Sequence, residues 1–261
     1  MLEEYKKHAE ERSSQGIPPL PLNAEQVAEL VELLKSPPVG EEKFIVDLIT
    51  NRTPAGVDPA AYVKAAFLTD VAKGKASSPL IDKLLATELL GTMLGGYNVE
   101  SLINLLDDKD VGSIAADGLC KTLLMFNAKH DVIELAKKNE NAKRVVESWS
   151  AAEWFTDRPE LPEMIKAIVF RVDGEINTDD LSPAPDAPSR PDIPLHALAM
   201  LKKTMQDPIA TIDKLKESGL PVVFVGDVVG TGSSRKSATN SLLWHIGEDI
   251  PFIPNKKQAG I

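Results

Sequence analysis

The segment "GDVVGTGSSRKSATNS", residues 226–241, combines glycines, hydroxyl groups and cations in a pattern that suits an anion. The apolar run "PVVFV" before it predicts a buried strand, and the residues after it have helical periodicity. At the N-terminus of a helix, backbone N–H groups lack an intrahelical acceptor and the helix dipole is positive. The segment therefore predicts an anion site between a strand and a helix.

Two common nucleotide-binding patterns fail in this segment at one residue. A dinucleotide-binding loop needs a third glycine three residues after Gly232, where this sequence has Arg235. A Walker loop needs glycine directly before Lys236, and Arg235 again stands in that place. A nucleotide-binding domain with a degenerate loop stays open only as an alternative that binding of ATP or NAD would reveal.

The side chains of this loop favour a carboxylate over a phosphate. Arg235 is always charged and can bind a carboxylate through two hydrogen bonds, and it follows the hydroxyls of Ser233 and Ser234. A small polycarboxylate is therefore the predicted ligand. The alternative is that the two serines only cap the helix and that Arg235 is solvated.

A second polar stretch, "NTDDLSPAPDAPSRPD" at residues 177–192, adds acidic residues and another arginine, Arg190. It belongs to residues 173–194, which contain five prolines and show no helical period. The sequence predicts one long loop there, and loops of this length in compact domains are more often functional than not. His196 and His245 stand among helical neighbours and are expected to be structural.

The elements that must position these residues form a small α/β domain. Strands are predicted at 166–172 and 221–229, with helices at 195–203, 209–219 and 238–247.

The preceding residues, 2–155, are helical throughout, with eight or nine helices separated by short breaks. In the clearest one, Asn23 and Gln26 form a capping box before a stripe of Val27, Leu30, Val31 and Leu34. The helices fall into loose pairs that favour a HEAT-type stack, with a plain bundle as the alternative. "LDDKD" at 106–110 is acidic enough for a metal but is better explained as a helix-ending turn.

Composition limits the classes of function. The chain has 39 Asp and Glu against 29 Lys and Arg, a net charge of −10 that disfavours nucleic acid and anionic membranes as partners of the whole surface. No apolar run approaches a membrane span, so a cytoplasmic location is expected. Cys120 is the only cysteine, which excludes a multi-cysteine metal site made by this chain alone. It is predicted to be a buried residue on a helix.

Several stretches together resemble the bacterial aconitase B family. The resemblance is carried by "TDDLSPAPDAPSRPDIPLHALAM" and "VGDVVGTGSSRKSATNS", and it continues through "MLEEYKKHAEER", "ELLGTMLGGYN", "SWSAAEWF" and "PFIPNKK". It implies a multidomain α plus α/β protein. A HEAT-like helical domain would cover residues 1–156 and a linker 157–165. A partial aconitase swivel domain, incomplete at its C-terminal end, would cover 166–261.

The resemblance also implies a reaction and a set of residues. The family interconverts citrate and isocitrate through cis-aconitate, and its members are also assigned to 2-methylisocitrate dehydration. Ser233 matches the catalytic base, Arg190 and Arg235 match the substrate-carboxylate arginines, and Ser234 matches a residue lining the same pocket. Asp179 matches a position with a supporting role. Asp180 stands where other aconitases have histidine, and it is given no role.

The resemblance further implies a 4Fe-4S cluster in the full-length enzyme. Its cysteine ligands would lie outside this chain, so this chain alone is expected to bind no cluster and to lack hydratase activity. A different function remains open for the helical domain, which could act as an interaction module. The family's helical domain is associated with homodimers and with mRNA contacts, but the net charge of −10 argues against strong RNA binding by this part.

Overall fold

The computed structural model describes residues 1–122, 124–157, 160 and 162–260, and its chain divides into two compact units. The helical unit comprises Pro21–Glu160 with Met1 and Phe252–Pro254. The α/β unit comprises Leu2–Leu20, Leu161–Pro251 and Asn255–Ile261. The predicted linker at 157–165 includes positions 158, 159 and 161, which lie outside the described residues.

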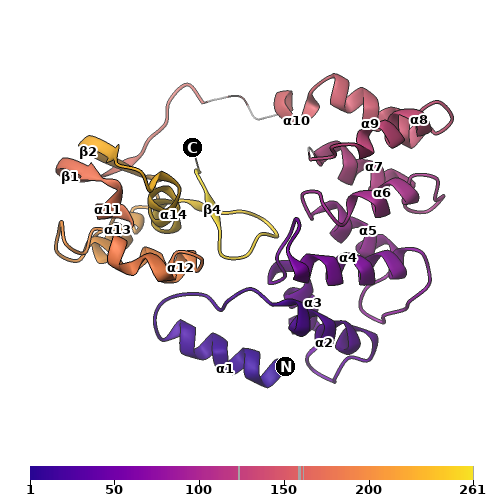
Figure 1. Cartoon of the computed structure of the whole chain (residues 1–261), viewed down its shortest axis with the longest axis horizontal. Helices are drawn as coiled ribbons and strands as arrows, with labels where there is room; N and C mark the ends of the chain where they lie inside the picture. The colour runs from indigo at the N-terminus through magenta and orange to yellow at the C-terminus, as the bar shows by residue number, and fades with distance from the viewer. Residues whose placement is uncertain (123, 158–159, 161, 261) are drawn as a thin grey trace. The chain divides into compact units, whose positions relative to one another are not determined.

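The helical unit is a succession of helices stacked along the chain (Figure 1). Their bounds are α2 Ala24–Lys35, α3 Glu42–Asn51, α4 Pro59–Ala72, α5 Lys83–Gly91, α6 Val99–Leu105, α7 Gly112–Lys121, α8 Ala128–Leu135, α9 Glu140–Ser150 and α10 Glu153–Thr156. Helices α2, α4, α5, α7 and α9 each contact the next in that series, and α3, α6 and α8 contact members of it. The helical prediction for this half of the chain is confirmed.

Local sequence explains where these helices begin and how closely they pack. The capping box of Asn23 and Gln26 is present at the start of α2, and the predicted stripe of apolar residues on that helix is buried. Helices α5 and α7 cross at two glycines. A Cβ built on Gly118 would lie 2.8 Å from the Cα of Gly91, so only residues without a side chain allow this approach.

The acidic turn after α6 contains an ion-pair cluster. Lys83 Nζ lies 2.8 Å from an Asp108 oxygen and 2.9 Å from an Asp110 oxygen. The hydrogen bond from Lys83 lowers the pKa of Asp108, and the two carboxylates raise the pKa of Lys83. Lys83, on α5, is therefore the ion-pair partner of two carboxylates in this turn.

The α/β unit contains a pair of parallel strands with helices beside them (Figure 1). Its elements are α1 Leu2–Ser13, β1 Ile168–Asn177, α11 Thr178–Leu181, the 3-10 helix η1 Ala184–Ser189, α12 Ile193–Ala197, α13 Pro208–Lys216, β2 Val222–Thr231, α14 Arg235–Ile246, β3 Glu248–Asp249 and β4 Lys257–Gln258. Strand β1 pairs with β2 in parallel, and β3 pairs with β4 in antiparallel. The core contains Phe170, Val172, Ile176, Leu181, Met200, Leu201, Ile212, Val222 and Ala238.

Three sequence-based predictions in this unit are wrong. The strand predicted to be buried, β2, has only Val222 buried, because most of its other side chains are partly or fully exposed. Residues 173–194 are not one loop, because β1 continues to Asn177 and is followed by α11 and η1. The predicted helix at 195–203 is short, since α12 ends at Ala197. Leu201 has a φ of 57° and its N–H donates to the carbonyl of Asp180 at 2.8 Å, which takes the chain out of helical geometry.

Helix α1 belongs to the α/β unit by its contacts, although the sequence boundary at residue 156 assigns it to the helical domain. An amphipathic helix does not reveal from its own pattern which core it packs against. In the part of the chain that the structure describes, no helix combines the length and the apolar character needed to cross a membrane.

Candidate functional site

The site lies where the two parallel strands end. Asn177 and Thr231 are register partners, so the segments that follow β1 and β2 leave the sheet at the same edge. The first leads into α11 and the second into the glycine and serine loop before α14. In open α/β sheets ligands bind outside the carboxyl ends of the strands, and the two polar stretches singled out from the sequence meet in that place.

Gly232 holds the loop against α11. Its φ is +105°, and a Cβ added to it would lie 2.5 Å from the Thr178 Oγ1. A side chain at this position would therefore meet both backbone strain and a collision. Gly232, which the sequence pattern placed in the predicted anion loop, thus also allows this loop to lie close to α11.

A capping box fixes the start of α11. The Asn177 side chain accepts from the N–H of Asp179 at 2.8 Å and from that of Asp180 at 3.0 Å. The Asp180 carboxylate accepts from the N–H of Asn177 at 2.9 Å and from the Thr204 hydroxyl at 3.0 Å. Asp180, which the sequence left without a role, is therefore a structural residue. Asp179 beside it is exposed.

The loop residues themselves lie at the start of α14. Ser233 and Arg235 are exposed and Ser234 is half-buried at the N-cap position. The Ser234 hydroxyl does not accept a hydrogen bond from the first turn of α14, all of whose residues are described. Ser234 is therefore not the side-chain cap that the alternative assumed, whereas Arg235 is exposed, as that alternative expected. The Arg235 N–H donates to the Ser233 carbonyl at 2.9 Å, so the N–H groups of Lys236 and Ser237 are the first-turn donors that an anion could meet.

Arg190 reaches the same place from the C-terminal end of η1. Its Nη2 donates to the Ser234 Oγ at 3.5 Å and to the Ser182 carbonyl at 3.3 Å. Its Nε is buried and has no hydrogen-bond partner among the described residues. Buried polar groups without a partner are rare in proteins.

His196 stands at the centre of the segment that carries Arg190. Its Nε2 lies 2.8 Å from the Ser182 Oγ and its Nδ1 lies 2.8 Å from the Ser189 Oγ. Burial lowers the pKa of His196, which favours the neutral ring. His245 is also buried, with a lowered pKa, and its Nε2 lies 2.9 Å from the Ala197 carbonyl. Both histidines have the structural surroundings that the sequence predicted.

Comparison with known proteins assigns the chain to a family. Residues 4–155 match the family model described as the aconitate B N-terminal domain, and residues 167–261 match the one described as the aconitate hydratase 2 N-terminus. The chain belongs to the aconitate hydratase B family. The resemblance found in its motifs is thereby confirmed.

Relatives within the aconitate hydratase B family are similar along the whole chain. The relative from Pseudomonas aeruginosa is 62% identical over 271 aligned residues, and the one from Escherichia coli is 59% identical over 272. A relative from Synechocystis is 58% identical over 262. All three matches cover 100% of this chain and 30 or 31% of the relative. The chain therefore spans about a third of the length of these curated relatives.

The iron–sulfur cluster expected for the aconitate hydratase B family does not fit the residues of this chain. Cys120 is the only cysteine, and it is half-buried on α7 in the helical unit, whereas burial was predicted. Among the described residues, no three His, Cys, Asp or Glu side chains gather in a way that could hold a metal ion. Cluster ligation therefore has no donor set here.

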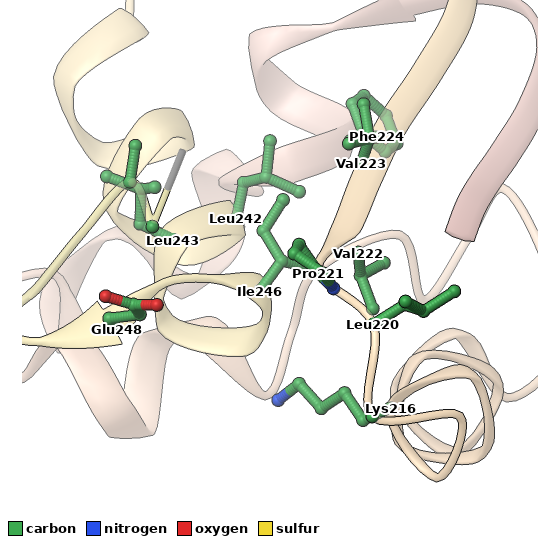
Figure 2. A pocket seen from close by; sticks show the side chains of 13 residues that line it. Lys216, Leu220, Pro221, Val222, Val223, Phe224, Leu242, Leu243, Ile246 and Glu248 are labelled. Atoms are coloured by element: carbon green, nitrogen blue, oxygen red, sulfur yellow. The ribbon is translucent and has the colours of Figure 1, made fainter. Parts of the chain in front are cut away.

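A pocket of about 520 Å³ in the α/β unit lies away from the predicted site residues. Figure 2 shows its apolar wall of Leu220, Val222, Phe224, Leu242 and Ile246, with Lys216 and Glu248 at its margin. It adjoins the start of β2, whereas the glycine and serine loop follows the end of that strand. Its apolar lining does not suit a polycarboxylate. The candidate site is therefore the edge formed by α11, η1 and the start of α14.

Proposed function

We propose that this chain supplies the substrate-carboxylate groups and the catalytic base of an aconitate hydratase. The proposed reaction is the reversible conversion of citrate to isocitrate through cis-aconitate, in the tricarboxylic acid cycle, and also dehydration of 2-methylisocitrate in the methylcitrate cycle. In this proposal residues 1–156 are a HEAT-like domain and 166–261 the first part of a swivel domain. The observation that carries the proposal is the contact of Arg190 Nη2 with the Ser234 hydroxyl, which joins two polar segments that follow the carboxyl ends of the parallel strands.

Carboxylate binding follows from the cations around this loop. Arg190 reaches the Ser234 hydroxyl, and Arg235 begins α14 at its positive end. These groups concentrate positive charge locally on a chain whose net charge is −10. Arginine matches the planar carboxylate geometry with paired hydrogen bonds, which suits a ligand with several carboxylates.

In the proposed mechanism Ser233 removes the proton from the carbon next to the departing hydroxyl. A serine hydroxyl is a weak base at neutral pH, so its alkoxide needs stabilisation by N–H groups and cations. The start of α14 and the Arg235 guanidinium are the nearest groups in the sequence that can provide it. Asp179, exposed at the start of α11, has the supporting role. The proposal assigns no step to the cluster, for which this chain has no ligands.

Citrate titration of the 261-residue chain tests the ligand. Calorimetry or NMR should detect binding, and Arg235→Gln and Arg190→Gln should each weaken it by about tenfold to a hundredfold, as loss of a charge-assisted hydrogen bond does. Lys236→Gln is the matched control, because it removes the same charge from the next residue. It should change the affinity by about threefold or less.

The same titration separates the rival ligands. If ATP or NAD binds and citrate does not, the nucleotide alternative replaces this proposal. If all three arginine and lysine variants weaken citrate equally, the binding is a general charge effect and not a carboxylate site.

A second candidate function is docking by the helical unit, with another copy of the chain as the proposed partner. A pocket of about 520 Å³ is lined by apolar residues of the α3–α4, α5–α6 and α7–α8 loops. Phe126 and Leu94 line it, are 79% and 55% exposed, and have φ values of 45° and 65°. Exposed apolar side chains held in a disfavoured backbone region indicate an interaction surface. Its apolar character favours a protein over mRNA.

Sedimentation of the chain over a range of concentrations tests this second candidate. A dimer that Phe126→Asp dissociates would support it, with Val39→Asp, at an exposed residue outside the pocket, as the matched control. A monomer at all concentrations would contradict it, and tight binding of RNA at moderate salt would replace it by the mRNA function.

A further inference from the structure

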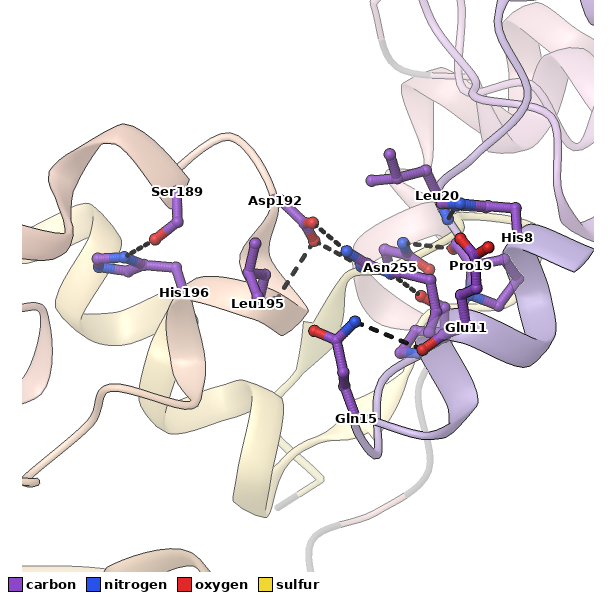
Figure 3. Close-up of polar contacts among 12 residues, drawn as sticks. His8, Glu11, Gln15, Pro19, Leu20, Ser189, Asp192, Leu195, His196 and Asn255 are labelled. Carbon is purple, nitrogen blue, oxygen red and sulfur yellow. Dashed lines mark hydrogen bonds and ion pairs between the residues drawn. The ribbon is translucent and has the colours of Figure 1, made fainter.

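An ion pair links helix α1 to the segment that contains Arg190. Arg12, near the end of α1, forms a two-pronged ion pair with Asp192: its Nη1 lies 2.5 Å from one carboxylate oxygen and its Nη2 lies 2.9 Å from the other. Figure 3 shows Asp192 in the turn that precedes α12, with its hydrogen bonds directed toward α1. Paired hydrogen bonds of this kind fix orientation as well as distance.

The Arg12 side chain is held on its own side as well. It is 8% exposed, and its Nε donates to the Pro18 carbonyl at 2.8 Å. The neighbouring Pro19 carbonyl accepts from Asn255 Nδ2 at 3.0 Å, so the end of α1 and the turn after it are anchored within the α/β unit (Figure 3). These hydrogen bonds therefore hold the Arg12 guanidinium in place beside Asp192.

Asp192 is two residues after Arg190 and is itself a structural residue. Its side chain accepts from the N–H of Leu195 as the N-cap of α12, and its own N–H donates to the Ser189 carbonyl at 2.9 Å. On the other side of Arg190, the Ser189 hydroxyl lies 2.8 Å from His196 Nδ1. Arg190 thus stands between two anchored neighbours, one tied to α1 and one tied to a buried histidine.

The hydrogen bonds that the Arg190 side chain makes are too long to fix the position of its guanidinium group. They measure 3.3 and 3.5 Å, and its buried Nε has no partner among the described residues. Hydrogen bonds to guanidinium groups are ordinarily shorter than this. The backbone on either side of Arg190 therefore contributes to the orientation of its side chain.

We propose that Arg12 is a positioning residue for the carboxylate site, and that helix α1 orients Arg190 through Asp192. This inference rests on the proposed function only in naming citrate as the ligand that Arg190 meets. The positioning role of α1 does not depend on which ligand binds. In this role, α1 supports the site from a position about 180 residues earlier in the chain.

The Arg190 side chain can be followed directly by NMR through its Nε–Hε signal, in the 261-residue chain without ligand. In the wild-type chain this proton is expected to exchange slowly with water, because the Nε is buried. Arg12→Met should speed its exchange by about tenfold or more and weaken citrate binding by a similar factor, while Arg12→Lys, which keeps the charge, should fall between.

Arg171→Met is the matched control. Arg171 also forms ion pairs with aspartates in the α/β unit, Asp173 and Asp227, but it is 62% exposed. Its loss should leave the Arg190 exchange rate and the citrate affinity within about threefold of wild type. If Arg12→Met unfolds the chain, Arg12→Lys and Asp192→Asn carry the test.

The outcomes distinguish this inference from the proposed function. Faster Arg190 exchange in the Arg12 variants, without any citrate binding by the wild-type chain, would support the positioning role and contradict the proposed ligand. Folded Arg12 variants with unchanged Arg190 exchange and unchanged citrate affinity would overturn the positioning role.

Discussion

Arg190 Nη2 lies 3.5 Å from the Ser234 hydroxyl, although 44 residues separate the two in sequence. The contact brings the end of η1 to the start of α14, so two polar stretches that are far apart in the sequence lie against each other. Arg190 provides a fixed positive charge, and Ser234 stands next to the proposed base Ser233. This pairing underlies the predictions below.

Gly232 is predicted to be intolerant of any side chain. Gly232→Ala should lower the free energy of unfolding by about 3 kcal/mol, because the added Cβ would collide with Thr178 as well as strain the backbone. Gly230→Ala is the control: its φ of +82° gives strain, but the Cβ would meet open space, so the loss should be about 1 kcal/mol. Urea unfolding measures both, and equal losses would contradict the close approach.

Asp179 and Asp180 should have opposite roles despite their adjacency. Asp180→Ala removes the hydrogen bonds to Asn177 and Thr204 and should lower the free energy of unfolding by about 1–2 kcal/mol. Asp179→Ala, at an exposed position, should change stability by less than about 0.5 kcal/mol but weaken citrate binding if the residue supports the site. Unfolding and citrate titration of both variants check this. The reverse pattern would contradict the assignment.

Because of Lys64, the free energy of unfolding should vary with pH in the alkaline range. The residue is 2% exposed in the helical unit, and burial lowers its pKa to about 8 from 10.5. Because the unfolded chain then binds more protons than the folded one, stability should rise with pH between these values. The free energy of unfolding should increase by about 2 kcal/mol from about pH 7 to about pH 10 through this group.

Replacing the lysine isolates that contribution. Lys64→Met should lack the increase, so the difference in unfolding free energy between wild type and variant should change by about 2 kcal/mol over the same range. Lys43→Met, at an exposed position on α3, should give a difference that does not vary with pH. A Lys64→Met difference that is also constant would show that the lysine titrates normally in the folded chain.

Much of the local structure could be predicted from the sequence because it depends on residues close together. The capping box at Asn23 and the buried stripe of α2 follow from spacing alone. The order of strand, loop and helix before α14 was predicted for the same reason, since strand, glycines and helix are contiguous. Arg190 was found because it is an arginine in a proline-rich segment of an α/β domain and matches a family motif.

The long-range contacts were missed because no local pattern encodes them. The ion pair of Arg12 with Asp192 joins residues 180 apart, and α1 has the pattern of any amphipathic helix. The contacts of His196 with Ser182 and Ser189 depend on how α11 and η1 turn back on each other. The Asn177 capping box could have been found, since Asp180 stands three residues after it, but the prolines that follow masked the short helix.

Loss of proton abstraction on replacing Ser233 tests the central claim most directly. In a chimera where residues 1–261 replace the matching part of the Pseudomonas aeruginosa relative, Ser233→Ala should lower kcat for isocitrate dehydration by about 10²–10⁴-fold with KM nearly unchanged. Ser237→Ala, one turn further along α14, should keep kcat within about threefold. A Ser233→Ala chimera with the kcat of its parent would contradict the assignment of Ser233 as the base.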